Sequence, residues 1–301
     1  MNELEIKLNT LLSKSTKEPI NISDELIEEF GENCKALLVK QFNTAREKDF
    51  RLRMSNIGKD IRQLHLDKIY GESEVSPQAK LNFIFGDIIE ALIMTLLKTA
   101  GVEFVGESGK VSLPISGEEL KGEYDAIYKD QLTGDNYLID IKSASPYSFD
   151  NKFKDYETLK DGDSFGYRLQ GFGYDAAQKD TQSTCFKGWF VVNKVNGEFK
   201  FVEVAEDIYP VEWNEAVRDI AEVVEHFRDD KPLPPCPGVK KELWRKKETG
   251  EVILADGPNE PCRWCKRKDK CHPEGELRKS PGVKWYTYLD KDKEITFENP
   301  E

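Results

Sequence analysis

The feature that most constrains the fold is the stretch GEYDAIYKDQLTGDNYLIDIKSAS, residues 122–145. Two alternating apolar runs flank a turn that contains Gly134, which predicts two neighbouring strands of a half-buried sheet. Each run also carries charge, Asp125 in the first and Asp140 with Lys142 in the second. Because alternate residues of a strand share a face, Asp140 and Lys142 should lie about 7 Å apart on one side. Burying either charge is costly unless it is paired or binds a metal.

Two interpretations of these charges are open. An Asp-x-Lys sequence taken alone favours an ordinary ion pair of Asp140 and Lys142 on a solvated face. Alternatively, carboxylates on adjacent strands, Asp125 and Asp140, can converge on one hard cation such as Mg²⁺. Glu90 favours the second interpretation, because it stands in the apolar helical run DIIEALIM, where a side chain cannot easily reach water. The competing interpretation of Glu90 is a narrow polar stripe that it shares with Gly86 and Asp87.

Two further polar residues share a helical face. The run LQGFGYDAA then places Gln170 and Tyr174 four residues apart, so both lie on one side of a predicted helix. Taken alone, this spacing usually indicates packing.

Taken together and in order, these residues resemble the nuclease domain of the RecB family in the PD-(D/E)XK superfamily. The family pattern is a helical His or Glu, then G-x-x-D, then D/E-x-K, then Q-x-x-x-Y. The chain has Glu90, GEYD ending at Asp125, DIK from Asp140 to Lys142, and QGFGY from Gln170 to Tyr174. The resemblance covers roughly residues 50–230. It implies a divalent-metal-dependent deoxyribonuclease, which we expect to be an exonuclease in phage or bacterial DNA recombination, repair or processing.

The resemblance also implies roles for the individual residues. Asp125 and Asp140 would coordinate Mg²⁺ or Mn²⁺, with Glu90 as a further ligand and the Ile141 carbonyl as another. Lys142 would activate the attacking water or stabilise the developing charge. A bound metal and a nearby cation are what phosphodiester hydrolysis requires.

The resemblance further implies contacts with DNA. Gln170 and Tyr174 would touch the DNA backbone near the scissile phosphate. Charge and position suggest additional phosphate contacts, which are Arg51, Arg53, Lys59 and Arg62. The net charge of −12 argues against a protein that simply coats nucleic acid, although residues 46–68 and 240–271 are locally basic.

A cluster of cysteines near the C-terminus predicts a second metal site. Cys262, Cys265 and Cys271 fall within ten residues, and nothing else in the sequence indicates secretion and disulfides. Thiolates at this density indicate zinc or an iron–sulfur cluster, whereas free cysteines in a loop are the alternative. Cys185 is expected to pack in the core. His65 and His226 are read as surface or packing residues, and His272 is a minor zinc candidate.

The resemblance favours a structural [4Fe-4S] cluster over Zn²⁺. Iron–sulfur members of the family carry three such cysteines after the core and one before it, in S-x-x-G-x-C-P-R. This chain has SNIGKDIR, with Asp60 at the cysteine position. The fourth ligand is therefore open, with Cys236 preferred, Asp60 second and Cys34 third. Trp264 is expected to pack near the centre.

The pattern of elements predicts an α/β fold. We expect a restriction-endonuclease-like core, a central mixed sheet flanked by helices, with a helical N-terminal region and a cysteine-rich metal-binding tail. The three parts are residues 1–45, 46–232 and 233–301. Ser23 should cap one helix, Ser55 or Asn56 a second, and Gly101 should end a third. Asn196-Gly197 predicts a hairpin, and the tail reads as turns.

Composition and motifs limit the remaining choices. No run of about 18 apolar residues occurs, so no membrane-spanning helix is expected. The N-terminus is too acidic for a signal peptide. The expected location is therefore a cytoplasm, which would be the host cytoplasm if a phage encodes the protein. The sequence has no helicase P-loop, so a helicase or recombination protein would be a partner. The alternatives are a Cas4-like CRISPR adaptation nuclease, a non-catalytic DNA-binding scaffold, and a structural zinc adaptor.

Overall fold

The computed structural model describes residues 2–43, 49–71, 74–178, 184–229, 239–254, 262, 265–280 and 285–289. The helical elements are α1 (Glu3–Ser15), α2 (Asp24–Leu38), the π-helical turn η1 (Val39–Asn43), the 3₁₀ turn η2 (Met54–Asn56), α3 (Ile61–Tyr70), α4 (Pro77–Thr99), α5 (Pro146–Asn151), α6 (Tyr156–Asp161), α7 (Tyr167–Gln178), α8 (Tyr209–Arg228) and α10 (Lys268–Cys271). Over these described residues, none of the helices combines the length and the apolar character that a membrane crossing requires.

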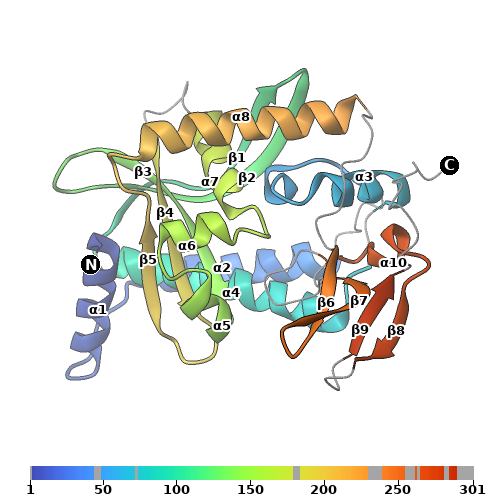
Figure 1. Ribbon diagram of the computed structural model, residues 1–301. Helices are drawn as coiled ribbons and strands as arrows, with labels where there is room; N and C mark the ends of the chain where they lie inside the picture. The colour runs from blue at the N-terminus through green and yellow to red at the C-terminus, as the bar shows by residue number, and fades with distance from the viewer. Residues whose placement is uncertain are drawn as a thin grey trace.

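The main sheet is five-stranded and mixed, in the order β1-β2-β3-β4-β5 (Figure 1). Its strands are β1 (Glu103–Ile115), β2 (Glu118–Lys129), β3 (Asn136–Ala144), β4 (Thr184–Asn193) and β5 (Phe199–Glu203). Strands β3 and β4 pair in parallel, and the other neighbours pair antiparallel. The predicted α/β core, a mixed sheet flanked by helices, is confirmed at this level.

Helices cover both faces of the main sheet (Figure 1). On one face, Leu4 and Leu8 of α1 pack with Ile93 and Leu97 of α4 against the sheet. On the other face, α7 and α8 form the larger core, whose buried residues include Phe172, Trp189 and Ile220. Strand β3 lies between these two cores, so most of its side chains are buried.

Two of the predicted helix ends are confirmed and one is wrong. Ser23 caps α2 by accepting the N–H of Leu26, and Gly101, at φ 80°, follows the last residues of α4. Neither Ser55 nor Asn56 caps α3, because residues 54–56 form the 3₁₀ turn η2. The cap of α3 is Asp60, whose Oδ1 accepts the N–H of Arg62 at 3.0 Å.

A contact between two glycines joins η2 to the start of α7. A Cβ added to Gly58 would lie 2.1 Å from the Cα of Gly166, so neither position has room for a side chain. Gly166 has φ 77°, a conformation that favours glycine. This contact brings the segment before α3 against the helix that carries Gln170 and Tyr174.

The tail contains a second, four-stranded antiparallel sheet instead of the expected turns, in the order β6-β7-β9-β8. Its strands are β6 (Val239–Trp244), β7 (Lys247–Leu254), β8 (Glu276–Lys279) and β9 (Trp285–Leu289). The β6–β7 turn places Arg245 and Lys246 at φ 48° and 66°. Gly, Asn or Asp normally marks such a turn, so the sequence gives no hairpin signal there.

Candidate active site and cysteine pocket

The two strand carboxylates lie where the pairing of β2 and β3 ends. The antiparallel register runs from Lys129–Asn136 to Ala126–Ile139, and its next pair would be Asp125 and Asp140. Instead, Oδ2 of Asp125 accepts the backbone N–H of Ile141 at 2.6 Å. The Asp125 side chain thus satisfies a backbone donor that the strand ladder no longer pairs.

The Asp140–Lys142 pair is buried, so the interpretation of a solvated ion pair is wrong. Asp140 is 1% exposed, and its Oδ2 lies 2.5 Å from Nζ of Lys142. Its other oxygen, Oδ1, is also buried and has no hydrogen-bond partner among the described residues. A buried carboxylate oxygen without a donor is costly, which suits a site that takes up a cation.

Glu90 reaches the same charged cluster from α4. One turn earlier, a Cβ on Gly86 would lie 3.4 Å from Oγ of Ser143, so α4 passes close to the end of β3. Burial raises the pKa of Glu90 to about 7, Lys142 opposes this shift, and Asp140 adds to it. Asp87 is engaged elsewhere, because its Oδ2 accepts a hydrogen bond from Gln41 at 2.8 Å.

The charges of this cluster perturb one another strongly. Burial raises the pKa of Asp125 well above its ordinary range, and the nearby Asp140 raises it further. Burial also raises the pKa of Asp140, although Lys142 opposes it. Burial favours the neutral amine of Lys142, but the carboxylates of Asp140 and Asp125 raise its pKa overall. One lysine therefore faces more acid than it can neutralise, and clustered perturbed groups indicate a functional site.

Helix α7 brings the remaining predicted residues to the cluster. Nε2 of Gln170 donates to the Tyr174 hydroxyl at 2.7 Å. Burial raises the pKa of Tyr174, and Asp140 raises it further, so the phenol lies within electrostatic range of the acids. The predicted shared helical face is confirmed.

Two residues that were not predicted, Tyr167 and Lys40, also lie near these charges. Nζ of Lys142 lies 5.7 Å from the centre of the Tyr167 ring, a cation–π arrangement. Tyr167 precedes Gln170 by three residues, and this helical spacing was the available signal. Lys40, in the π-helical turn η1, lines a pocket of about 300 Å³ together with Glu90, Asp87, Glu107 and Glu123. No pattern in the sequence marks Lys40.

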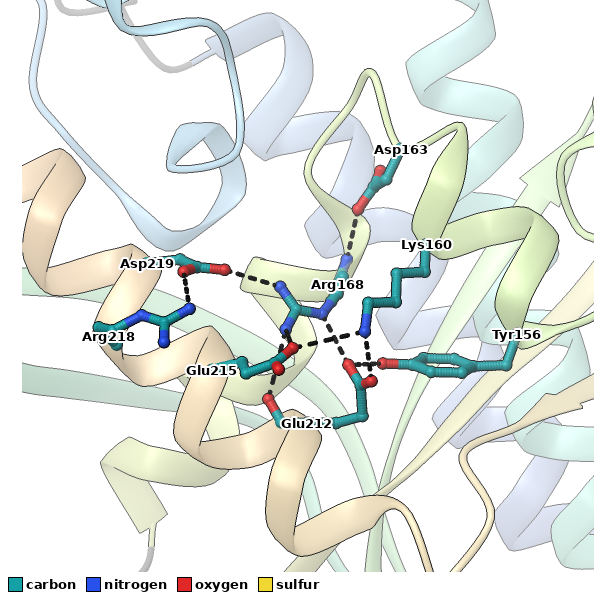
Figure 2. A network of polar contacts seen from close by, with 8 residues as sticks. All are labelled: Tyr156, Lys160, Asp163, Arg168, Glu212, Glu215, Arg218 and Asp219. Atoms are coloured by element: carbon teal, nitrogen blue, oxygen red, sulfur yellow. Dashed lines mark hydrogen bonds and ion pairs between the residues drawn. The ribbon is translucent and has the colours of Figure 1, made fainter.

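A network of buried polar contacts fixes α7 against α6 and α8 (Figure 2). The carboxylate of Asp163 accepts the backbone N–H groups of Gly166, Tyr167 and Arg168 at the start of α7. The Arg168 side chain pairs with Glu212 and with Asp219 of α8, each at 3.0 Å. Tyr156 and Lys160 of α6 also bind Glu212. These contacts fix the position and rotation of α7, and so aim Tyr167, Gln170 and Tyr174.

The predicted phosphate contacts do not form one group. Arg51 and Arg53 line a separate pocket of about 470 Å³, with Glu118, Glu119 and Lys121. Lys59 lies 3.5 Å from Asp67. Arg62 is 5% exposed, and its Nε donates to Sγ of Cys271 at 3.3 Å. A guanidinium buried against a thiol is not available at the surface, so Arg62 is removed from the proposed DNA contacts.

The three clustered cysteines line one small pocket with the start of α3. Its lining residues are Asp60, Arg62, Gln63, Cys262, Cys265, Lys268 and Cys271. Cys34 lies on α2 and is not part of this lining. Cys185 is exposed, so its expected place in the core is wrong, because it is the outward residue of an otherwise buried strand. Cys236 and Trp264 lie outside the described residues.

Neither site is a preformed metal cage. Among the described residues, no three or more His, Cys, Asp or Glu side chains are already arranged so that they could hold a metal ion. The donor chemistry nevertheless fits in both places. Buried carboxylates suit a hard divalent cation, and three thiols in one pocket suit zinc or iron.

Comparison with known proteins does not assign the chain to a family. No protein-family model matches the sequence, and no curated protein matches it. Among solved structures, one described as "Crystal structure of SSO0001" is 15% identical and covers 69% of this chain and 88% of its own, with a TM-score of 0.38. That score is too low to support an argument about fold or function.

Proposed function

We propose that the protein is a divalent-metal-dependent deoxyribonuclease, with a restriction-endonuclease-like core at residues 46–232. The observation that carries the proposal is the buried cluster of Asp125, Asp140 and Lys142 at the point where β2 and β3 stop pairing. An ordinary core would replace such charges with apolar residues, because burying them destabilises the fold. Their retention is explained if the cluster binds a cation and a phosphate.

Asp125, Asp140, Glu90 and the Ile141 carbonyl would hold Mg²⁺ or Mn²⁺. Oδ1 of Asp140, buried and without a hydrogen-bond partner in the described part of the chain, supports this assignment. A bound divalent ion lowers the pKa of its water and neutralises charge on the phosphate. The raised pKa values of Glu90, Asp125 and Asp140 mean that these groups must release protons before they bind a cation.

Lys142 is the residue by which the protein contributes positive charge at this site. Its pKa is raised, so it stays protonated at neutral pH and acts as an electrostatic stabiliser rather than as a base. Lys142, which pairs with Asp140 in this structure, would bind a phosphate oxygen of the DNA. The ring of Tyr167, 5.7 Å away, keeps it in position.

Helix α7 would position the DNA. Gln170 is partly exposed and would contact the backbone near the scissile phosphate. Tyr174 is 3% exposed, so the predicted direct contact with DNA is replaced by a positioning role, in which its hydroxyl orients Gln170 through their 2.7 Å hydrogen bond. Arg51, Arg53 and Lys59 are proposed as outer phosphate contacts. The proposed setting is a cytoplasm, with a helicase or recombination protein as the partner that supplies DNA ends.

The three cysteines of the tail would hold a structural metal centre, a [4Fe-4S] cluster or alternatively Zn²⁺. The position of the pocket supports a stapling role, because its lining joins α3 to residues about two hundred positions later in the chain. Such a centre would fasten residues 233–301 to the core.

Cleavage of end-labelled linear DNA and closed circular DNA tests the proposal. Wild-type protein should degrade linear single- or double-stranded DNA with Mg²⁺ or Mn²⁺ and should be inactive with a chelator. An intact circle would assign exonuclease mode, and a nicked circle endonuclease mode. If no substrate is cut and DNA is still bound, the alternative is a non-catalytic DNA-binding scaffold.

A further inference from the structure

The pocket of the tail contains one carboxylate besides its three thiols. Asp60, at the start of α3, lines the same small pocket as Cys262, Cys265 and Cys271. We propose that Asp60 is the fourth ligand, so that three thiolates and one carboxylate hold the metal centre. This inference rests on the proposed cysteine centre and is independent of the nuclease activity.

The Asp60 side chain is oriented by the helix that it caps. Its Oδ1 accepts the N–H of Arg62 at 3.0 Å, which fixes the carboxylate at the first turn of α3. A carboxylate offers about four lone pairs on two oxygens, so a capping aspartate can also bind a metal. The capping hydrogen bond orients the ligand, as hydrogen bonds to metal-binding carboxylates generally do.

Arg62 places a buried positive charge at this pocket. Its side chain is buried, and its Nε donates to Sγ of Cys271 at 3.3 Å. Such a guanidinium is compatible with thiolates, because a charge-assisted hydrogen bond favours the ionised sulfur. Arg62 thus offsets part of the negative charge that three thiolates and Asp60 would bring together.

Contacts that do not depend on a metal already hold the two walls of the pocket together. Nε of Arg267 pairs with the buried Asp67 of α3 at 2.9 Å. Lys266 donates to the carbonyl of Glu74 at 2.7 Å. These pairs position the tail beside α3, so no metal is needed to bring the four donors to one pocket.

His272 is the other nearby residue that could be the fourth ligand, so we compare it with Asp60. It is buried, and its Nε2 has no hydrogen-bond partner among the described residues, yet it does not line the pocket. The geometry therefore favours Asp60 over His272 as the fourth ligand. Asp60 is a harder ligand than a thiolate, so its bond to zinc or iron should be the first to open.

Metal content and metal release of the full-length protein, purified without oxygen, test the assignment. Iron, zinc and acid-labile sulfide are measured per chain, and then the rate of metal loss to a chelator. Asp60→Asn keeps a good helix cap but removes the anionic oxygen, so release should be about tenfold faster. Asp60→Cys is a poorer cap but a better ligand, so its release should be slower than that of wild type.

The controls separate ligation from folding. His272→Gln and Cys236→Ser should release metal within about twofold of wild type, because neither residue is the proposed ligand. Iron with matching sulfide would identify a cluster and zinc alone a mononuclear site, and the assignment of Asp60 holds for both.

Three outcomes would overturn the inference. In the first, Asp60→Asn retains metal as wild type does. In the second, Cys236→Ser loses the metal instead. In the third, wild-type protein contains no metal, which would also remove the cysteine centre. Cleavage of DNA is assayed separately, so that failure of this inference is not confused with failure of the proposed nuclease.

Discussion

The carboxylate of Asp125 holds the backbone N–H of Ile141 at 2.6 Å, one residue beyond Asp140 in the sequence. This hydrogen bond replaces a strand–strand contact and fixes Asp125 beside the buried Asp140. The Asp125 side chain therefore both accepts a backbone hydrogen bond and brings negative charge beside Asp140. Substitutions of Asp125 can separate these two effects.

Asp125→Asn should preserve the fold and abolish the chemistry. An asparagine oxygen can still accept the Ile141 N–H, but it no longer brings negative charge beside Asp140. We expect the metal-free protein to gain about 1 kcal/mol in its free energy of unfolding, because a buried like-charge pair is removed. Cleavage should fall by about a hundredfold or more. Urea denaturation and a cleavage assay measure the two effects, and Asp125→Ala, which loses the hydrogen bond as well, is the comparison.

The stability of the metal-free protein should fall as pH rises toward neutrality. The pKa of Glu90 is raised from 4.5 to about 7, so between these values the folded chain holds a proton that the unfolded chain has released. The free energy of unfolding therefore decreases across this window, by about 3 kcal/mol from Glu90. Asp125 and Asp140 act in the same direction, because their pKa values are also raised.

Glu90→Gln should remove the Glu90 part of this pH dependence. Adding Mg²⁺ should stabilise wild-type protein more at pH 8 than at pH 5.5, because the cation binds the ionised carboxylates. Thermal unfolding at both pH values, with and without Mg²⁺, measures this. A stability that rises from pH 4.5 to 7 without metal, and equally in both variants, would contradict the account.

Gln170 and Tyr174 should act as a pair. Tyr174→Phe removes the hydroxyl that accepts the Gln170 hydrogen bond, and Gln170→Ala removes the donor. Each should reduce cleavage by about tenfold, and the double variant should lose little more than either single one. A double-mutant cycle on kcat/KM measures the coupling. Fully additive losses would show that the two side chains work separately.

The network in Figure 2 should be sensitive to the loss of one charge. Glu212→Gln leaves the buried Arg168 with one ion pair fewer and should destabilise the fold by about 3 kcal/mol. Arg218→Ala, on the same helix, removes an exposed pair with Asp219 and should change stability by less than about 0.5 kcal/mol. Urea denaturation of both variants tests this, and equal effects would contradict the assignment of the buried pair.

The sequence predicts the charged strands well because their pattern is local. Alternation around Asp140 and Lys142 and the helical spacing of Gln170 and Tyr174 depend only on nearby residues. Their convergence is what the structure adds, because the distance between Asp140 and α7 depends on how α7 packs. The same holds for Arg62, which was expected at the surface from its charge alone and is buried against a cysteine about two hundred residues later.

The tail shows where local signals fail. Arg245 and Lys246 form a turn at positive φ without glycine or asparagine, so the β6–β7 hairpin has no marker in the sequence. The predicted cap of α3 was wrong because a local signal was again misleading. Ser55 and Asn56 are good capping residues, but η2 uses the Asn56 side chain to bind the N–H of Arg53, and Asp60 takes the cap.

The most direct test of the central claim compares wild type with Lys142→Ala on end-labelled DNA in Mg²⁺ or Mn²⁺. Lys129→Ala is the control, because this lysine is exposed and ends the neighbouring strand β2 opposite Asn136, away from the cluster. We predict metal-dependent cleavage by wild type and Lys129→Ala, and a loss of about a thousandfold in Lys142→Ala. If the folded Lys142→Ala protein cleaves DNA as fast as wild type, or if wild type cleaves no DNA with either metal, the buried cluster is not a nuclease site.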